Sequence, residues 1–200
     1  IFEGKKSIKQ FDKLELQNVN FNYKNSKKIL SKINLKIKKN TISCIIGGNG
    51  SGKTTLVNIL SGLLKPKSGK LIINSNYDLQ KNRKLNIGYV AQNINLVDDT
   101  IKNNIIFGNR SSQINKRNFD WCVRYSGIES FVKKLPSKYN TLVGDRGTKI
   151  SGGQAQKIGI ARALYNNPDI LILDEFNSSL DIQSENLIIN NFYQLKKYMT

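Results

Sequence analysis

The sequence predicts an α/β fold built on a parallel sheet, and three observations carry that prediction. The continuous apolar run ILIL at 170–173 is typical of a strand buried in the middle of a parallel sheet. The β-branched run at 41–46 ends abruptly in GGNGSGKTT, and LVNILSGLL then has helical spacing, which indicates a strand, a glycine loop and a helix. Between Thr100 and Leu164 the pattern is mostly helical, so we expect a helical insert in the α/β core.

The remaining elements are short strands. Residues 14–21 (LELQNVNF) and 33–37 (INLKI) alternate apolar and polar side chains, which predicts half-buried strands joined through a polar turn at 25–28. Residues 71–73 and 87–90 are expected to be further strands of the same domain. A chain of 200 residues is long enough to bury the core of one such domain.

Composition excludes several classes of protein. No stretch approaches the roughly 18 consecutive apolar residues of a membrane-spanning helix. The only cysteines, Cys44 and Cys122, lie far apart in the chain, so neither a disulfide framework nor a paired-cysteine metal site is indicated, and a reducing compartment fits. The sequence has 0 histidines, which excludes serine-histidine hydrolases and histidine metalloenzymes.

The formal net charge of +18 has two interpretations. Of the 32 basic residues 26 are Lys and 6 are Arg, and abundant Lys, Ile and Asn indicate a genome rich in A and T. Because nucleic-acid surfaces favour Arg, this count argues against a nucleic-acid partner. Yet 11 Lys and no acidic residue lie between Glu15 and Asp78, so a basic face towards a membrane, a nucleic acid or a nucleotide stays open.

A phosphate site is predicted at the glycine loop. Gly47, Gly52, Lys53 and Thr54 match the pattern G-x-x-x-x-G-K-[ST] between a predicted strand and a predicted helix. Glycines let successive backbone N–H groups point at a phosphate, and the helix N-terminus adds partial positive charge. The Lys53 ammonium would meet the β- and γ-phosphates, and the Thr54 hydroxyl would be a hard ligand for Mg²⁺.

Two carboxylates follow the apolar run at 170–173. Asp174 and Glu175 would stand at the carboxyl edge of the sheet, where open α/β folds bind ligands. We expect Asp174 to hold the Mg²⁺ shell and Glu175 to polarise the attacking water. Alone, such a pair is equally consistent with a solvated strand end, and the glycine loop is what favours the site.

Residues Ser151, Gly152, Gly153 and Gln154 (SGGQ) resemble the signature sequence of the ABC ATPases, and the resemblance covers about residues 12–200. It implies a P-loop NTPase core with a parallel sheet, an N-terminal antiparallel β subdomain and a helical insert at about 94–164. ATP and Mg²⁺ are the implied cofactors. The implied nucleotide-binding residues are Tyr23, Gly47, Gly48, Asn49, Gly50, Ser51, Gly52, Lys53, Thr54, Thr55, Gln92, Ser151, Gly152, Gly153, Gln154 and Asp174.

The resemblance also assigns roles to single residues. Tyr23 is similar to the aromatic that stacks on adenine, although such a residue equally suits a core. Gln92 resembles the glutamine that touches Mg²⁺ and the attacking water, so the implied catalytic set is Glu175, Gln92 and Lys53, and the metal set is Thr54, Gln92 and Asp174. Asp181 resembles the loop that communicates between paired sites, and TLVGDRG at 141–147 resembles the segment that contacts coupling helices in exporters.

Some positions depart from the family pattern. Ile150 stands where Leu is usual, Ala155 where a basic residue is usual, and Phe176-Asn177 replace a small pair after the catalytic glutamate. The family's switch histidine follows one more strand after Thr200, so the ATPase domain is expected to be incomplete at its C-terminus. Residues 1–11 are expected to link residues 12–200 to an upstream, transmembrane region.

The resemblance favours the ATP-binding domain of an ABC exporter at the cytoplasmic face of the inner membrane. Its expected partners are a second ABC ATPase domain in a head-to-tail pair and transmembrane domains in the same polypeptide, with no direct nucleic-acid contact. Similarity to exporters of lipid-linked oligosaccharides or other glycolipids suggests that cargo. Two alternatives are a soluble ABC ATPase acting on nucleic acid or ribosomes, which the charge would suit, and a nucleotide-gated module without turnover.

Overall fold

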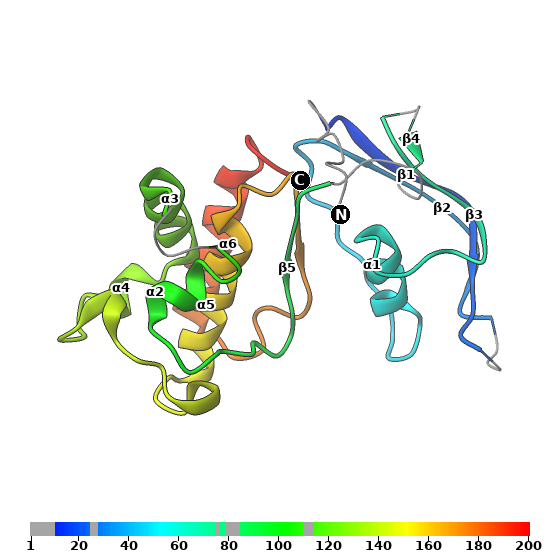
Figure 1. Ribbon diagram of the computed structural model, residues 1–200. Coiled ribbons are helices and arrows are strands. Elements are labelled where there is room, and N and C mark those ends of the chain that lie inside the picture. Colours follow the sequence, from blue (N-terminus) through cyan, green and yellow to red (C-terminus); the bar gives the residue numbers. More distant parts are fainter. Residues whose placement is uncertain (1–10, 25–27, 75–76, 79–84, 110–113) are drawn as a thin grey trace, which may run out of the picture. The chain divides into compact units, whose positions relative to one another are not determined.

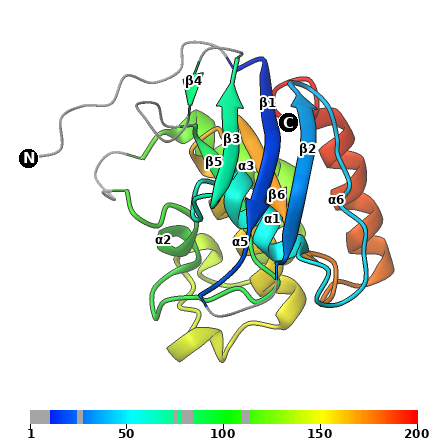
Figure 2. The ribbon, with the colours of Figure 1, turned by 90° about the vertical axis from the view of Figure 1, so that its right-hand side faces the viewer.

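The computed structural model describes residues 11–24, 28–74, 77–78, 85–109 and 114–200 (Figures 1 and 2). The chain divides into two compact units: unit 1 comprises Ile1–Leu85 with Met199–Thr200, and unit 2 comprises Asn86–Tyr198. Of the expected linker, residues 1–10 lie outside the described residues, whereas Phe11 is buried and so packs with unit 1. The predicted turn at 25–28 also falls mostly outside them, because only Lys28 is described.

Unit 1 is built on an antiparallel sheet, as the resemblance implied. Its strands are β1 (Lys13–Phe21), β2 (Leu30–Lys38), β3 (Ser68–Ile73) and β4 (Tyr77–Asp78). Figure 2 shows them side by side in the order β2-β1-β3-β4. The alternation read from the sequence produces the buried face, since Leu14 of β1 lies opposite Ile37 of β2 and Ile73 of β3, and all three side chains are buried.

The glycine loop leads into α1 (Lys53–Leu60). This helix is shorter than the predicted apolar pattern, which continued to Leu64. It ends because Ser61 closes the last turn and Gly62 adopts a left-handed conformation with φ of 75°.

Residues 41–46 differ from the prediction. They form no ladder with any described strand of unit 1, and the side chains of Ile42 and Ile46 are 57% and 89% exposed. A strand exists only where its backbone N–H and C=O groups pair with a neighbour, and the described strands of unit 1 pair with one another instead. Among the described strands of unit 1, residues 41–46 therefore have no pairing partner.

Unit 2 contains the parallel pair that the sequence predicted. Strands β5 (Ile87–Val90) and β6 (Ile170–Leu173) pair in register from Ile87 opposite Ile170 to Val90 opposite Leu173. Helix α5 (Gly152–Tyr165) packs on β5 so closely that a Cβ at Gly88 would lie 2.6 Å from the carbonyl oxygen of Ala163. Glycine at this position is therefore required by packing.

The predicted helical region contains the other helices of unit 2. These are α2 (Ile101–Ile105), α3 (Lys116–Ser126), α4 (Glu129–Val132) and the short 3₁₀ turns η2 (Lys138–Asn140) and η3 (Asp145–Gly147), and α6 (Ile182–Leu195) follows β6. Helix α5 contributes several fully buried residues to the core of unit 2, among them Ile158, Ile160 and Leu164. None of the helices described is long and apolar enough to cross a membrane.

Candidate functional site

The glycine loop of unit 1 takes its shape from its glycines. Gly50 and Gly52 have φ of 74° and 94°, in the left-handed region that side chains disfavour. A Cβ at Gly47 would lie 2.6 Å from the Oγ of Ser51, so the loop closes on itself there. Gly52 is the N-cap of α1, and the free N–H groups of the first turn follow it. The local sequence therefore places backbone donors at a helix N-terminus, which suits an anion.

The Lys53 side chain folds back over this loop. Its Nζ donates hydrogen bonds to the carbonyl oxygens of Gly47 and Gly48 at 2.9 and 3.0 Å. The ammonium is thus held beside the same backbone turn that presents the N–H groups. The predicted partners Asn49 and Thr54 are exposed along the loop and the first turn.

Tyr23 lies beside the start of α1. Its hydroxyl is 3.4 Å from the Oγ1 of Thr55, which is buried, and its ring packs edge-on against Phe21 with centroids 5.0 Å apart. The side chain is 45% exposed, so part of the ring remains accessible for stacking. The structure therefore places Tyr23 beside the start of α1, next to the glycine loop of unit 1.

The two carboxylates of unit 2 stand where β6 ends. The N–H of Asp174 donates to the carbonyl of Val90 at 2.9 Å, which extends the parallel pairing beyond the strand. The Nε2 of Gln92 donates to Oε2 of Glu175 at 2.6 Å. Sequence reasoning placed Gln92 and Glu175 at the ends of two strands, and the structure brings them into direct contact.

Tyr89 is a member of this cluster that the sequence analysis missed. Its hydroxyl donates to Oδ2 of Asp174 at 2.9 Å. Burial, and then the hydrogen bond and charge of Asp174, raise the pKa of Tyr89 to about 12, so the phenol stays a donor at neutral pH. The strand register could have predicted this contact. Tyr89 pairs with Ile172, and Ile172 lies on the same face of the strand as Asp174.

The signature residues open α5. Ser151 is the N-cap and forms a capping box with Gln154, with Ser151 Oγ accepting from the N–H of Gln154 and Gln154 Oε1 accepting from the N–H of Ser151. A Cβ at Gly153 would lie 2.9 Å from the carbonyl oxygen of Ser179. Two of the four predicted residues therefore stabilise the helix start, and Gly153 permits close packing against the 177–181 loop.

Asp181 caps α6 and connects it to α5. Its carboxylate accepts from the N–H and the Oγ of Ser184 at 2.9 and 2.7 Å, and these bonds, the side-chain one first, lower the pKa of Asp181. The Oγ of Ser184 also accepts from Nζ of Lys157 at 2.8 Å. The loop that ends at Asp181 is therefore fixed to the helix that begins at the signature.

The donor chemistry of the predicted metal ligands fits Mg²⁺. Thr54, Asp174 and Gln92 offer hydroxyl, carboxylate and amide oxygens, and the Gln92 amide keeps its oxygen available while its nitrogen bonds Glu175. Among the described residues no group of three or more His, Cys, Asp or Glu side chains could hold a metal alone. Protein sites commonly bind Mg²⁺ through few side chains together with phosphate oxygens and water.

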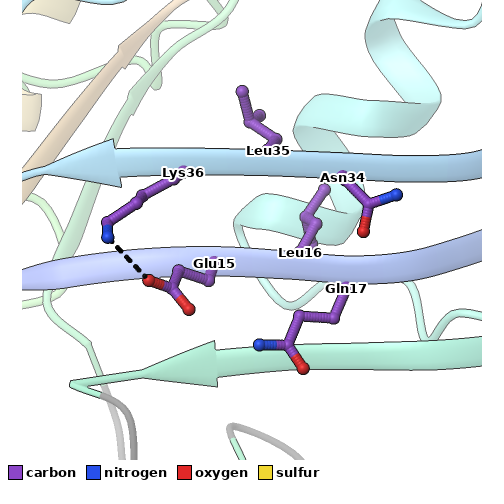
Figure 3. A pocket seen from close by; sticks show the side chains of 6 residues that line it. All are labelled: Glu15, Leu16, Gln17, Asn34, Leu35 and Lys36. Carbon is purple, nitrogen blue, oxygen red and sulfur yellow. Dashed lines mark ion pairs between the residues drawn. The ribbon is translucent and has the colours of Figure 1, made fainter.

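An open hollow of about 340 Å³ lies elsewhere, over β1 and β2 (Figure 3). It is lined by Glu15, Leu16, Gln17, Asn34, Leu35 and Lys36, which include none of the predicted site residues. Glu15 pairs there with Lys13 and Lys36 at 2.9 and 3.4 Å, and these pairings, that with Lys13 first, lower the pKa of Glu15. The carboxylate thus compensates part of the lysine charge on this face.

Comparison with known proteins gives concordant results. Residues 30–178 match the family model described as ABC transporter. The chain is 40% identical over 181 residues to ATP-binding cassette sub-family B member 5 of Mus musculus, covering 88% of this chain and 14% of that protein. It is 36% identical over 205 residues to the alpha-hemolysin translocation ATP-binding protein HlyB of Escherichia coli, covering 100% of this chain and 29% of that protein.

Among solved structures, the chain is similar to a bacterial Atm1-family ABC exporter with ATP bound. The TM-score is 0.87 at 29% sequence identity, over 96% of this chain and 34% of that one. The chain therefore spans about a third or less of the length of the proteins that it matches.

Proposed function

The chain belongs to the ABC transporter family and is an ATP-binding ATPase domain of the exporter type. We propose that it binds and hydrolyses Mg-ATP to drive export. The observation that carries the catalytic part is the hydrogen bond between Gln92 and Glu175 beside Asp174. This bond brings Gln92 and Glu175 together at one edge of the β5–β6 pair, and in this proposal the two side chains orient the attacking water there.

Each residue has a separate task in this proposal. The loop N–H groups and the Lys53 ammonium bind the β- and γ-phosphates, and Lys53 exchanges its two carbonyl acceptors for phosphate oxygens. Thr54, Asp174 and Gln92 would hold the Mg²⁺, and the metal would supply charge neutralisation to the phosphates. Glu175 accepts a hydrogen bond from the attacking water and orients it for in-line attack.

Two further contacts complete the proposed nucleotide-binding site. Tyr23, with its partly exposed ring beside the phosphate loop, stacks on the adenine. The signature residues Ser151 to Gln154 meet the γ-phosphate of ATP bound to a second copy of the domain, in a head-to-tail pair. In this assignment the domain extends over residues 12–200, with the helical insert at about 94–164.

Coupling to transport is assigned to residues 141–147. Leu142 forms an isolated bridge with Thr100 and is 53% exposed, so this segment offers an apolar contact beside α2. We infer that it contacts transmembrane domains of the same polypeptide, with the ATPase domain on the cytoplasmic side of the membrane. The exporter relatives support this over the alternative of a soluble ATPase acting on nucleic acid or ribosomes.

The cargo is a narrower proposal. Similarity of residues 96–105, 147–154 and 158–175 to glycolipid exporters favours a lipid-linked glycan. An ATPase domain makes little contact with cargo, so this proposal is tested separately, by adding lipid-linked glycans to the reconstituted complete polypeptide. Stimulated phosphate release with the glycan lipid, and none with the bare carrier lipid, is the expected result.

The main proposal is tested by phosphate release from the complete polypeptide in proteoliposomes. Release is expected with Mg-ATP, and not when EDTA removes the metal. Tyr23→Ala should raise the KM for ATP, while Tyr193→Ala, an exposed tyrosine on α6, should leave it unchanged. Undiminished release in EDTA would overturn the assigned metal chemistry.

A further inference from the structure

Glu175 has an unusual backbone conformation. Its φ is 46°, in the left-handed region that residues with a long side chain rarely adopt. Its side chain is exposed, so burial of its own atoms does not hold it there. Such a conformation persists only where neighbouring residues determine it.

The next two residues are both bound to α6. The ring of Phe176 packs edge-to-face against Phe192, with centroids 5.5 Å apart and an interplanar angle of 67°. The Nδ2 of Asn177 donates to Oε1 of Glu185 at 2.8 Å. Glu185 and Phe192 are two helical turns apart, so they lie on the same side of α6 and hold consecutive residues of the loop.

Helix α6 is itself a fixed support. The Nζ of Lys157 in α5 donates to Ser184 at its first turn, at 2.8 Å. The Nδ2 of Asn191 in its later part donates to the carbonyl of Tyr125 in α3, at 3.0 Å. Because both ends of α6 are bound to other helices, a residue that contacts α6 has a defined position in unit 2.

We propose that the Phe176–Phe192 and Asn177–Glu185 contacts form a latch that holds Glu175 in its left-handed conformation, with its carboxylate against Gln92. The four latch residues are positioning residues. The inference rests on the proposed function, in which Glu175 orients the water. It also accounts for the departure noted in the sequence: Phe176 and Asn177, where a small pair is expected, each have a partner on α6.

The mechanism of the latch is geometric. Without it, Glu175 can relax towards the right-handed conformation, which changes the direction of its side chain relative to the end of β6. Its carboxylate then leaves the 2.6 Å contact with Gln92 for part of the time. A general base displaced by about 1 Å loses on the order of a hundred-fold in rate at most, so partial loss of the latch should cost less.

The test uses Phe192→Leu and Asn177→Ala in the complete polypeptide. Each should lower kcat about ten-fold, with the KM for ATP and the ATP-dependent rise in Tm unchanged. Glu185→Leu should behave like Asn177→Ala, whereas Glu185→Gln, which keeps an acceptor oxygen, should restore most of kcat. A merely structural role predicts no such rescue and no split between kcat and KM.

Matched controls come from α3. Phe119→Leu breaks a similar edge-to-face pair, with Tyr139 at 5.2 Å and 79°. Asn118→Ala removes a similar bond to the carbonyl of Tyr165 at 3.0 Å, together with one that Asn118 accepts from Asn167. Both should lower Tm at least as much as the latch variants and leave kcat at the parental value. A fall in kcat as large in these controls would show a general loss of stability and overturn the latch.

Glu175→Gln separates this inference from the proposed function. If Glu175→Gln abolishes turnover but Phe192→Leu, Asn177→Ala and Glu185→Leu all keep parental kcat, the latch is wrong and the assignment of Glu175 stands. If Glu175→Gln turns over at the parental rate, both fail. If Phe192→Leu does not fold, the two variants of the Asn177–Glu185 contact decide the outcome.

Discussion

The phosphate loop of unit 1 and the carboxylate edge of unit 2 are built in different ways. The loop is local: glycines with positive φ and a helix start arrange backbone donors within a few residues, and Lys53 bonds carbonyls of the same loop. The carboxylate edge depends on distant partners, with Asp174 bound by Tyr89 and Glu175 by Gln92. We therefore expect ATP binding at the loop to depend on the charge of Lys53. We expect turnover at the carboxylate edge to depend on the side chains that contact Asp174 and Glu175.

The largest effect is expected for Lys53→Ala. No backbone N–H can replace a cation against the triphosphate, so ATP-dependent stabilisation should disappear. At ATP one hundred times above Kd the parent should gain about 2.7 kcal/mol, seen as a rise in Tm of several degrees. Lys65→Ala, an exposed lysine of the same unit, is the control and should keep the whole rise. An equal rise in both variants would show that ATP binds elsewhere.

Glu175→Gln should separate binding from turnover. The amide keeps an oxygen for Gln92 and the shape of the side chain, but it loses the basic carboxylate. Phosphate release should fall about 10²- to 10⁴-fold, while the ATP-dependent rise in Tm remains. Single-turnover release and thermal shifts on the same preparation are the measurements. A loss of both together would place Glu175 in binding instead.

The sequence predicted local features well, in the same way that it encodes the glycine loop locally. The loop motif is contiguous, so it indicated Gly47 to Thr54 directly, and the apolar runs predicted β5 and β6 at their observed bounds. The capping box of Ser151 and Gln154 is likewise local, whereas the close approach of Gly153 to Ser179 joins segments far apart in the chain.

Contacts made through tertiary structure escaped prediction. Tyr89 became a partner of Asp174 only through the β5–β6 register, and Phe176 gained a role only through its contact with Phe192. Residues 41–46 show the converse, because their apolar pattern predicts a strand but none of the described strands of unit 1 pairs with them. Propensity describes a segment, whereas ladders and side-chain bonds belong to pairs of segments.

A smaller effect is expected for Tyr89→Phe. Losing one hydrogen bond to a carboxylate costs about 1.5 to 3 kcal/mol when the carboxylate is buried, and Asp174 is only half-buried, so about 1 kcal/mol is expected. The Mg²⁺ concentration for half-maximal ATP-dependent stabilisation should rise about five-fold. Tyr193→Phe, which removes an exposed hydroxyl, should cause no change. A lower Mg²⁺ requirement would mean that the phenol competes with the metal.

The smallest effect is a difference in labelling between the two cysteines, one in each unit. Cys44 is exposed within 41–46, whereas Cys122 in α3 is fully buried and its Sγ contacts the carbonyl of Phe119 at 3.1 Å. Burial raises the pKa of Cys122 to about 12, so at pH 8 it is an un-ionised and shielded thiol.

N-ethylmaleimide should therefore label Cys44 within minutes and Cys122 only in denaturant. Peptide mass spectrometry measures the labelling, with Cys44→Ser and Cys122→Ser as controls. Because a raised pKa suppresses the thiolate at every pH below it, moving from pH 7 to pH 9 should still leave Cys122 unlabelled in the native protein. Protection of Cys44 in the native protein would show that residues 41–46 are covered in solution, as the strand predicted from their sequence would be.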